Sequence, residues 1–280
     1  MTHASSGPPI VLAFSVLDPS GSGGIQADIE TAASLGCHCT PIITALCAEG
    51  SIPETETVSV DPTIIIEQAR SVLAQMNVSA IKIGFLGSRA IAEAIHSILQ
   101  DYNTIPVVSH PALSLLDDEN SDHHQLVDAY TDLILPASAI ANFSLFEARA
   151  ISGEQDTVDT TAHAVIASGC QTAFITGTGK QTQAFQNSAY NAKGLIKNYQ
   201  WQQEQPISHG SASTLAMSMA AYLAHGFNEL QTIEQAQNYT WQSMRAARDI
   251  GFGRSTPHRL FWADQNIETT EDILPGTRTH

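Results

Sequence analysis

Short apolar runs alternate with amphipathic stretches along most of the chain. The runs predict β-strands over Ile10–Leu17, Thr40–Leu46, Ala80–Ile83, Pro106–Ser109, Leu133–Leu135 and Ala173–Thr176. The stretches between them have helical spacing and cover Ile25–Leu35, Pro62–Gln75, Arg89–Leu99, Asp122–Thr131, Leu145–Ile151 and Thr160–Ala167. Strands separated by helices of this length indicate βαβ units. We therefore expect an α/β fold with a central, mostly parallel sheet and helices on both faces.

The pattern changes in the last third of the chain, where an antiparallel hairpin and then two long helices are predicted. These elements cover 184–190, 194–201, Ser211–Leu223 and Ile233–Arg248. A hairpin of this kind is typical of an addition to the edge of a parallel sheet. The segment after Gly251 is polar, and we expect its end to be frayed. The prediction is a single domain over residues 8–265, with tails at 1–7 and 266–280.

Composition indicates a folded, strongly acidic protein. The chain has 280 residues, of which 43% are hydrophobic, so it can bury a large core. Its formal net charge is −16, which disfavours nucleic-acid binding, because affinity for phosphate backbones comes from clustered Lys and Arg. The sequence shows neither a signal peptide nor an apolar run long enough to span a membrane, so we expect a cytoplasmic location. The four cysteines lack metal-ligand spacing, and free thiols are expected.

The stretch Asp18-Pro-Ser-Gly-Ser-Gly-Gly-Ile-Gln-Ala-Asp28 links the first predicted strand to the first predicted helix. Glycines let the backbone approach a ligand closely, and the first N–H groups of a helix face that ligand unpaired. The stretch therefore indicates a small-molecule site at the carboxyl edge of the sheet, with a turn that binds nothing as the alternative. A dinucleotide fingerprint would need glycine at Gln26, which disfavours a Rossmann oxidoreductase.

This stretch, followed by Ile43-Thr-Ala-Leu46, resembles the opening of the hydroxymethylpyrimidine and phosphomethylpyrimidine kinases of thiamine biosynthesis. The resemblance extends over most of the chain and implies a ribokinase-like fold. It also implies ATP-dependent phosphorylation of 4-amino-5-hydroxymethyl-2-methylpyrimidine or its monophosphate, with Mg²⁺ and as a homodimer. The pyrimidine-binding residues implied by the resemblance are Asp28, Glu49, Gly21, Gly23 and Phe85; the family usually has Gln at the position of Glu49 and Met at that of Phe85.

The segment His209-Gly-Ser-Ala-Ser-Thr-Leu215 is similar to the family's HGTGCTLS turn, which forms an anion hole at a helix N-terminus. The resemblance implies that Gly210, Ala212 and Ser213 are the catalytic positions. Ser213 replaces the family's Cys, and Ala212 replaces its second glycine. A hydroxyl group ionises less readily than a thiol and is the poorer base. An ordinary Ser/Thr-capped helix is the alternative interpretation.

The nucleotide-binding positions differ further from the family. Thr176 and Gly177 lie where the family has Lys-Gly-Gly-His, so a lysine expected near the phosphates is lost. Ser144 and Glu147 correspond to an Asn-x-x-Glu motif, which implies that Ser144 lies near the nucleotide and that Glu147 helps to hold magnesium. His110 replaces an acid. A chain this acidic needs a metal ion to balance bound ATP, so Mg²⁺ is the expected cofactor.

Three hypotheses follow from this mixture of matches and departures. The favoured one is an active pyrimidine kinase. The second is a catalytically impaired relative that binds a pyrimidine-like ligand without phosphoryl transfer, because the glycine-rich half is nearly intact while the nucleotide half is altered. The third is a kinase for another vitamin-like alcohol such as pyridoxal, which would account for Glu49 and Phe85.

Overall fold

The computed structural model describes residues 7–47, 57–115, 121–179, 184–202, 208–251 and 254–264. Within these ranges nine strands form one sheet in the order β3-β2-β1-β4-β5-β6-β7-β8-β9. They are β1 (Ile10–Leu17), β2 (His38–Cys47), β3 (Thr57–Ser59), β4 (Val78–Ile83), β5 (Val107–Ser109), β6 (Ile140–Ser144), β7 (Thr172–Thr176), β8 (Ala184–Asn191) and β9 (Gly194–Gln202). Strands β3, β8 and β9 pair antiparallel and the others pair parallel, which confirms the predicted sheet and its edge hairpin.

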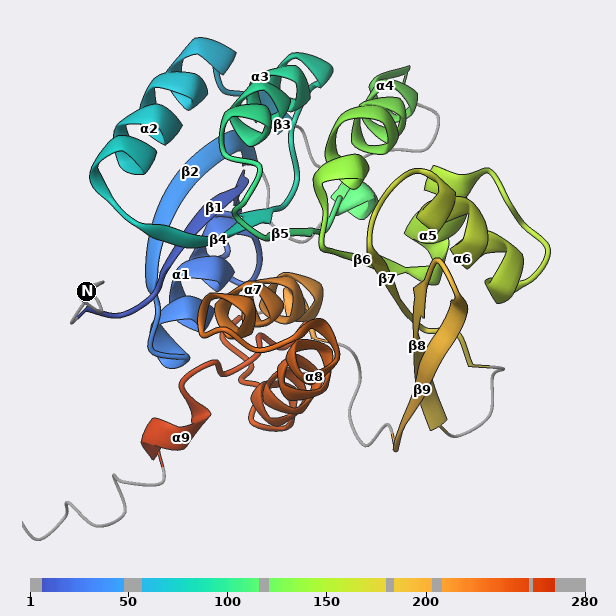
Figure 1. Cartoon of the computed structure of the whole chain (residues 1–280). Coiled ribbons are helices and arrows are strands. Elements are labelled where there is room, and N and C mark those ends of the chain that lie inside the picture. The colour runs from blue at the N-terminus through green and yellow to red at the C-terminus, as the bar shows by residue number, and fades with distance from the viewer. Residues whose placement is uncertain are drawn as a thin grey trace, which may run out of the picture.

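Helices cover both faces of the sheet (Figure 1). One face carries α1 (Gly24–Ser34), α7 (Ser211–Ala224) and α8 (Glu229–Arg245). The other face carries α2 (Pro62–Gln75), α3 (Arg89–Asp101), α4 (Ser121–Ala129), α5 (Leu145–Ser152) and α6 (Val158–Ala167). A short helix, α9 (Phe261–Asp264), follows the long helices of the first face. Each face has its own buried apolar layer against the sheet.

Helix α7 is buried on nearly all sides because it lies between the sheet and the helices α1 and α8. Its residues from Thr214 to Ala221 are all buried, and many of them are small. A helix that is apolar all round needs such a sandwiched position, and small side chains let its neighbours approach closely. This packing fixes the N-terminus of α7 against the carboxyl end of the sheet.

The predicted strand over Leu133–Leu135 is wrong. The chain forms a π-helical turn over Tyr130–Ile134 and a 3-10 turn over Leu135–Ala137, and the strand β6 begins only at Ile140. Ile134 and Leu135 are fully buried in the apolar layer under α3 to α6. A short apolar run shows burial but does not distinguish a strand from a buried helical turn, and this run was assigned by its apolar character alone.

Residues 254–264 of the polar segment after Gly251 pack against the rest of the fold. The end that is expected to be frayed lies outside the described residues. Thr256 exchanges two backbone hydrogen bonds with Arg248, both 2.9 Å long. Arg259 is only 1% exposed, and α9 follows it. The polar composition of this segment did not indicate burial, because a charged side chain is buried only when the fold supplies its partners.

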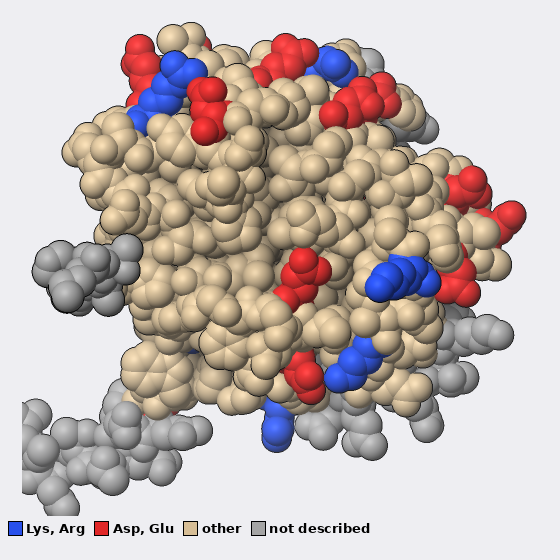
Figure 2. Space-filling model, in the orientation of Figure 1, with Lys and Arg blue, Asp and Glu red and all other residues tan. Residues whose placement is uncertain are grey.

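The cysteines, the helix lengths and the surface charge also relate to expectations from the sequence. All four cysteines, Cys37, Cys39, Cys47 and Cys170, are free, as predicted. None of the helices in the described ranges is long and apolar enough to cross a membrane. On the face shown in Figure 2, Lys and Arg are few and scattered among Asp and Glu, and most of that face is uncharged.

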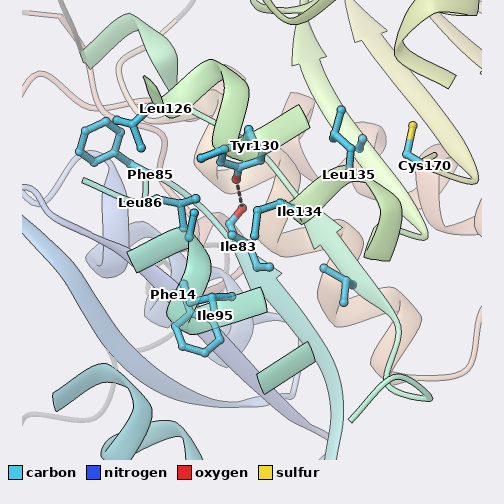
Figure 3. Packing of buried hydrophobic residues seen from close by; sticks show 14 of the residues in the cluster. Phe14, Ile83, Phe85, Leu86, Ile95, Leu126, Tyr130, Ile134, Leu135 and Cys170 are labelled. Atoms are coloured by element: carbon cyan, nitrogen blue, oxygen red, sulfur yellow. Dashed lines mark hydrogen bonds between the residues drawn. The ribbon is translucent and has the colours of Figure 1, made fainter. Parts of the chain in front are cut away.

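Tyr130 connects the π-helical turn to the end of β4. Its hydroxyl group donates to the Gly84 carbonyl at 2.9 Å and lies 3.2 Å from the Ile83 carbonyl (Figure 3). Burial raises the pKa of this phenol far above its usual value, so the group remains a donor. Gly84 lies in the segment that leaves β4, so Tyr130 anchors the backbone from which a functional site can be built.

We predict that Tyr130→Phe lowers the free energy of unfolding by about 1–3 kcal/mol, because the Gly84 carbonyl would be left buried without its donor. The matched control is Tyr102→Phe, at a partly exposed tyrosine that ends α3; its effect should stay within about 0.5 kcal/mol. Urea denaturation of both variants measures the difference. Equal losses in the two variants would contradict the anchoring role.

Candidate active site

A pocket of about 130 Å³ opens at the carboxyl ends of the neighbouring strands β1 and β4. From β1 the chain continues to β2 and β3 on one side, and from β4 it continues to β5 and β6 on the other. Connections that diverge in this way leave a crevice above the sheet, and open α/β folds bind ligands there. The predicted site residues that line the pocket are Gly23, Phe85, Gly210, Ala212 and Ser213.

The floor of the pocket contains a buried ion pair. Lys82 Nζ lies 2.8 Å from Asp28 Oδ2, and both side chains are 0% exposed. Burial raises the pKa of Asp28, while the charge of Lys82 and its hydrogen bond oppose this effect. Lys82 lines the pocket, whereas Asp28 lies behind it. Asp28 Oδ1 is buried and has no hydrogen-bond partner among the described residues. The expected direct contact between Asp28 and a ligand stays a prediction.

Lys82 is held tightly on its other sides. Its Nζ donates to Ser15 Oγ at 3.3 Å in addition to Asp28. A Cβ atom on Gly84 would lie 2.7 Å from both Lys82 Nζ and Ser15 Oγ, so glycine is required for this close packing. The ammonium group has three N–H bonds, and these two partners leave one for a ligand.

The wall of the pocket contains a second pair, Asp18 and His209. His209 Nε2 lies 3.2 Å from Asp18 Oδ2, which also accepts a hydrogen bond from the Gly23 N–H at 2.8 Å. Asp18 Oδ1 accepts from the Ser20 N–H at 2.8 Å. Burial acts to raise the pKa of Asp18, but the hydrogen bonds from His209, Ser20 and Gly23 outweigh it and lower the pKa. The carboxylate therefore stays ionised and holds the glycine-rich loop, residues 18–24, in shape.

Two helix N-termini converge on the pocket. Helix α1 has Gly23 as its N-cap and α7 has Gly210, and neither helix has a side-chain hydrogen bond at its cap. Gly23, Gly24, Gly210, Ala212 and Ser213 all line the cavity. Uncapped N-termini present free N–H groups and the positive ends of helix dipoles, which together suit an anion. The alternative of an ordinary Ser/Thr-capped helix does not apply to α7.

The loop and α7 touch through their backbones. Gly210 has φ +84°, and a Cβ atom there would lie 1.7 Å from the Ser22 carbonyl oxygen. No side chain fits between these two segments, and the left-handed conformation already favours glycine. The contact therefore depends on glycine at position 210 for two separate reasons.

Glu147, the residue expected to hold magnesium, forms hydrogen bonds with its neighbour Ser144. Glu147 is 3% exposed and forms a capping box with Ser144 at the start of α5. One carboxylate oxygen accepts from the Leu113 N–H at 3.0 Å, and the other accepts from Ser144 N and Oγ, both at 2.8 Å. The described residues contain no group of three or more His, Cys, Asp or Glu that could hold a metal ion. Both oxygens of Glu147 are thus occupied by hydrogen bonds within the chain, and its expected role in holding magnesium stays a prediction.

His110, which stands where the family has an acid, lines the pocket and is 4% exposed. Its Nδ1 lies 3.3 Å from the Asn142 carbonyl, which requires the proton on that nitrogen. Burial lowers the pKa of His110, against an opposing effect of the Glu147 charge. A neutral imidazole with Nε2 as an acceptor thus replaces a carboxylate on this wall.

Three further predicted residues, Thr176, Gly177 and Gly21, do not line the pocket. Thr176 Oγ1 donates to the Phe143 carbonyl at 3.2 Å, and Gly177 N–H donates to Asn187 Oδ1 at 3.2 Å. Gly21, with φ +71°, is in the glycine-rich loop but does not line the cavity. Glu49 lies outside the described residues. Its position follows β2, whose last residue, Cys47, lines the pocket.

Comparison with known proteins decides the family. The sequence model described as phosphomethylpyrimidine kinase matches residues 18–258. The chain belongs to the phosphomethylpyrimidine kinase family. A hydroxymethylpyrimidine/phosphomethylpyrimidine kinase of Rhizobium meliloti is 27% identical over 264 residues, which cover 91% of this chain and 99% of that protein. The corresponding enzyme of Escherichia coli is 24% identical over 251 residues, covering 87% and 94%.

Solved structures show the same fold for this family member. Bacillus subtilis pyridoxal kinase in complex with ADP has a TM-score of 0.83 at 22% identity, covering 91% of this chain and 99% of that one. A phosphomethylpyrimidine kinase from Clostridium difficile has a TM-score of 0.69 at 19% identity, covering 84% and 98%. These likenesses confirm the predicted ribokinase-like α/β fold.

Sequence reasoning missed several residues of the site. Lys82 lies in the predicted strand Ala80–Ile83, and His209 opens the stretch His209–Leu215, but no role was predicted for either. A lysine inside an apolar strand pattern is a signal for a buried partner. Asp18 opened the glycine-rich stretch and was not selected. His110 was noted only as a departure from the family. Nothing in the sequence pattern pointed to the buried Arg259.

We predict that Gly210→Ala lowers the free energy of unfolding by about 3 kcal/mol or more, since left-handed strain adds to a backbone clash. Gly226→Ala is the matched control, because Gly226 follows the other end of α7 with φ +85° and has nothing within 4 Å of an added Cβ. It should lose about 1–2 kcal/mol from strain alone. Chemical denaturation compares the two, and similar losses would show that the Ser22 contact is unimportant.

Proposed function

We propose that this protein transfers the terminal phosphoryl group of ATP to the hydroxyl group of 4-amino-5-hydroxymethyl-2-methylpyrimidine or to its monophosphate. The supporting observation is the pocket itself, where a small cavity with a lysine and an aromatic ring adjoins two uncapped helix N-termini. The first part suits a planar heterocycle and the second suits phosphate oxygens. Membership of a kinase family agrees with this chemistry.

On the substrate side, Phe85 is 1% exposed and offers an apolar surface for the ring. The remaining N–H of Lys82 donates to a ring nitrogen or to the hydroxyl oxygen of the substrate. Asp28 holds Lys82 in place through Oδ2, and its unpartnered Oδ1 is proposed to bind the ring. Gly21 and Gly23 shape the loop that closes over the ring, and Glu49 is proposed to reach the ring's amino group from beyond β2.

On the phosphoryl side, the backbone N–H groups of Ala212 and Ser213 point from the first turn of α7 toward the transferred group. Positive helix ends stabilise the charge of the transition state without a lysine, and fixed dipoles need no reorganisation during the reaction. Thr176, Gly177 and Ser144 are proposed to lie along the nucleotide. Magnesium, with Glu147 nearby, would neutralise charge on the phosphates.

Ser213 is a poor general base for the proposed reaction. Its hydroxyl group is a poor proton acceptor compared with the thiol that the family has there. Phosphoryl transfer through a loose transition state makes little demand on a base, so the reaction proceeds, but slowly. The homodimer stays a prediction, and so does the cytoplasmic location expected from the sequence.

We predict that the protein, supplied with Mg²⁺ and ATP, forms ADP when the hydroxymethylpyrimidine is added, with a kcat below the 1–100 s⁻¹ that is usual for kinases. A coupled ADP assay, run beside calorimetry of the pyrimidine alone, measures this. Binding heat without ADP formation would overturn the kinase and support the impaired binder. ADP formation with pyridoxal but not with the pyrimidine would instead support the third hypothesis.

A second prediction concerns the replaced thiol. Ser213→Cys combined with Ala212→Gly should raise kcat by about tenfold or more, because a thiolate forms more readily near neutral pH than an alkoxide does. Ser211→Cys is the control, since Ser211 begins the same helix but does not line the pocket. A rise with Ser211→Cys as well, or no rise with the double variant, would show that position 213 takes no part in proton transfer.

A further inference from the structure

The segment that follows α8 returns to the pocket and places one arginine beneath it. Arg259 is 1% exposed, and its carbonyl oxygen accepts from Ser34 Oγ at 2.6 Å and from Tyr239 Oη at 2.8 Å. These two partners belong to α1 and α8, so the backbone of Arg259 is fastened between both helices. The side chain therefore points into the protein and not into solvent.

The guanidinium group binds three different elements at once. Nε donates to Thr214 Oγ1 of α7 at 2.9 Å, and Nη1 donates to Glu30 Oε2 of α1 at 2.9 Å. Nη2 donates to the carbonyl of Ser22 in the glycine-rich loop. A planar fork with five N–H donors can satisfy such a set, whereas a lysine ammonium on a flexible stem cannot reach all three in this geometry.

The bonds from Arg259 to Thr214 and to Ser22 support the two sides of the backbone contact between Gly210 and Ser22. Thr214 Oγ1 donates onward to the Gly210 carbonyl at 2.9 Å, and Gly210 is the N-cap of α7. Ser22 provides the carbonyl that faces Gly210 across the backbone contact described above. Arg259 thus connects the loop that shapes the substrate pocket to the helix turn that receives the phosphoryl group.

We propose that Arg259 is a positioning residue for phosphoryl transfer, which sets the distance between the glycine-rich loop and the first turn of α7. This inference rests on the proposed function. Glu30 offers a compensating charge, so the contribution of Arg259 is geometric more than electrostatic. Displacing a reacting group by about 1 Å can cost about a hundredfold in rate, and a shift at this junction moves acceptor and phosphoryl group apart.

The test compares kcat and KM for Arg259→Gln and Arg259→Lys. We expect Arg259→Gln to lower kcat by about tenfold to a hundredfold with a smaller change in KM, and Arg259→Lys to recover only part of the loss. The control is Arg248→Gln, because Arg248 is half-exposed, comes from the same end of the chain and pairs with Asp264. It should keep the wild-type kcat. A kcat per folded molecule that is unchanged in Arg259→Gln would overturn the proposal.

A second measurement does not depend on activity. Hydrogen exchange followed by mass spectrometry should show faster exchange over residues 18–24 and 208–215 in Arg259→Gln, with other segments unchanged. Thr214→Val removes the bond from Arg259 to α7 together with the bond from Thr214 to the Gly210 carbonyl, and it leaves the bonds of Arg259 to Ser22 and Glu30 in place. It serves if Arg259→Gln does not fold, and it should raise exchange over 208–215 and lower kcat. If wild-type protein transfers no phosphate, the proposed function fails, and the exchange pattern still decides the role of Arg259. Exchange that rises evenly along the chain contradicts positioning.

Discussion

The buried ion pair between Lys82 and Asp28 is the interaction on which the site depends most. It joins β4 to α1 across the point where the chain diverges, and both side chains are wholly out of solvent. Removing one partner of such a pair leaves an uncompensated buried charge, which costs about 3–5 kcal/mol. The pair therefore fixes where α1 begins relative to β4, and the N-terminus of α1 and the floor of the pocket follow from that placement.

The second constraint is how an acidic protein binds phosphate. The net charge of this chain is −16, and Thr176 stands where the resemblance to the family implies a lysine. In the described structure, backbone N–H groups are available for phosphate instead. The helices α1 and α7 both begin at a glycine N-cap, and their first turns line one cavity. Helix dipoles act within the first turn, so this solution demands accurate placement of both helices. This need for accurate placement explains the buried Arg259 and the close contact between Gly210 and Ser22, which together hold the glycine-rich loop against α7.

The departures from the family fall into two groups in the structure. Ser213 and Ala212 line the cavity, and the uncapped N-terminus of α7 is kept there. Ser144 and Glu147 instead satisfy each other as a capping box, which stabilises the start of α5 whether or not a metal binds. The substitutions therefore reduce the expected rate more than they disturb the fold.

The sequence by itself determined the strand–helix alternation, the edge hairpin, the glycine-rich loop and the family, because periodicity and a long specific motif are local properties. It failed at Leu133–Leu135, where burial alone does not distinguish a strand from a helical turn. It did not indicate the ion pair between Asp28 and Lys82, fifty-four positions away, which only tertiary packing forms. The burial of Arg259 could not be predicted from local sequence either, because two of its partners, Ser22 and Glu30, lie more than two hundred positions earlier. Which charge is buried and what it holds depends on contacts between distant segments, and only the folded chain brings those segments together.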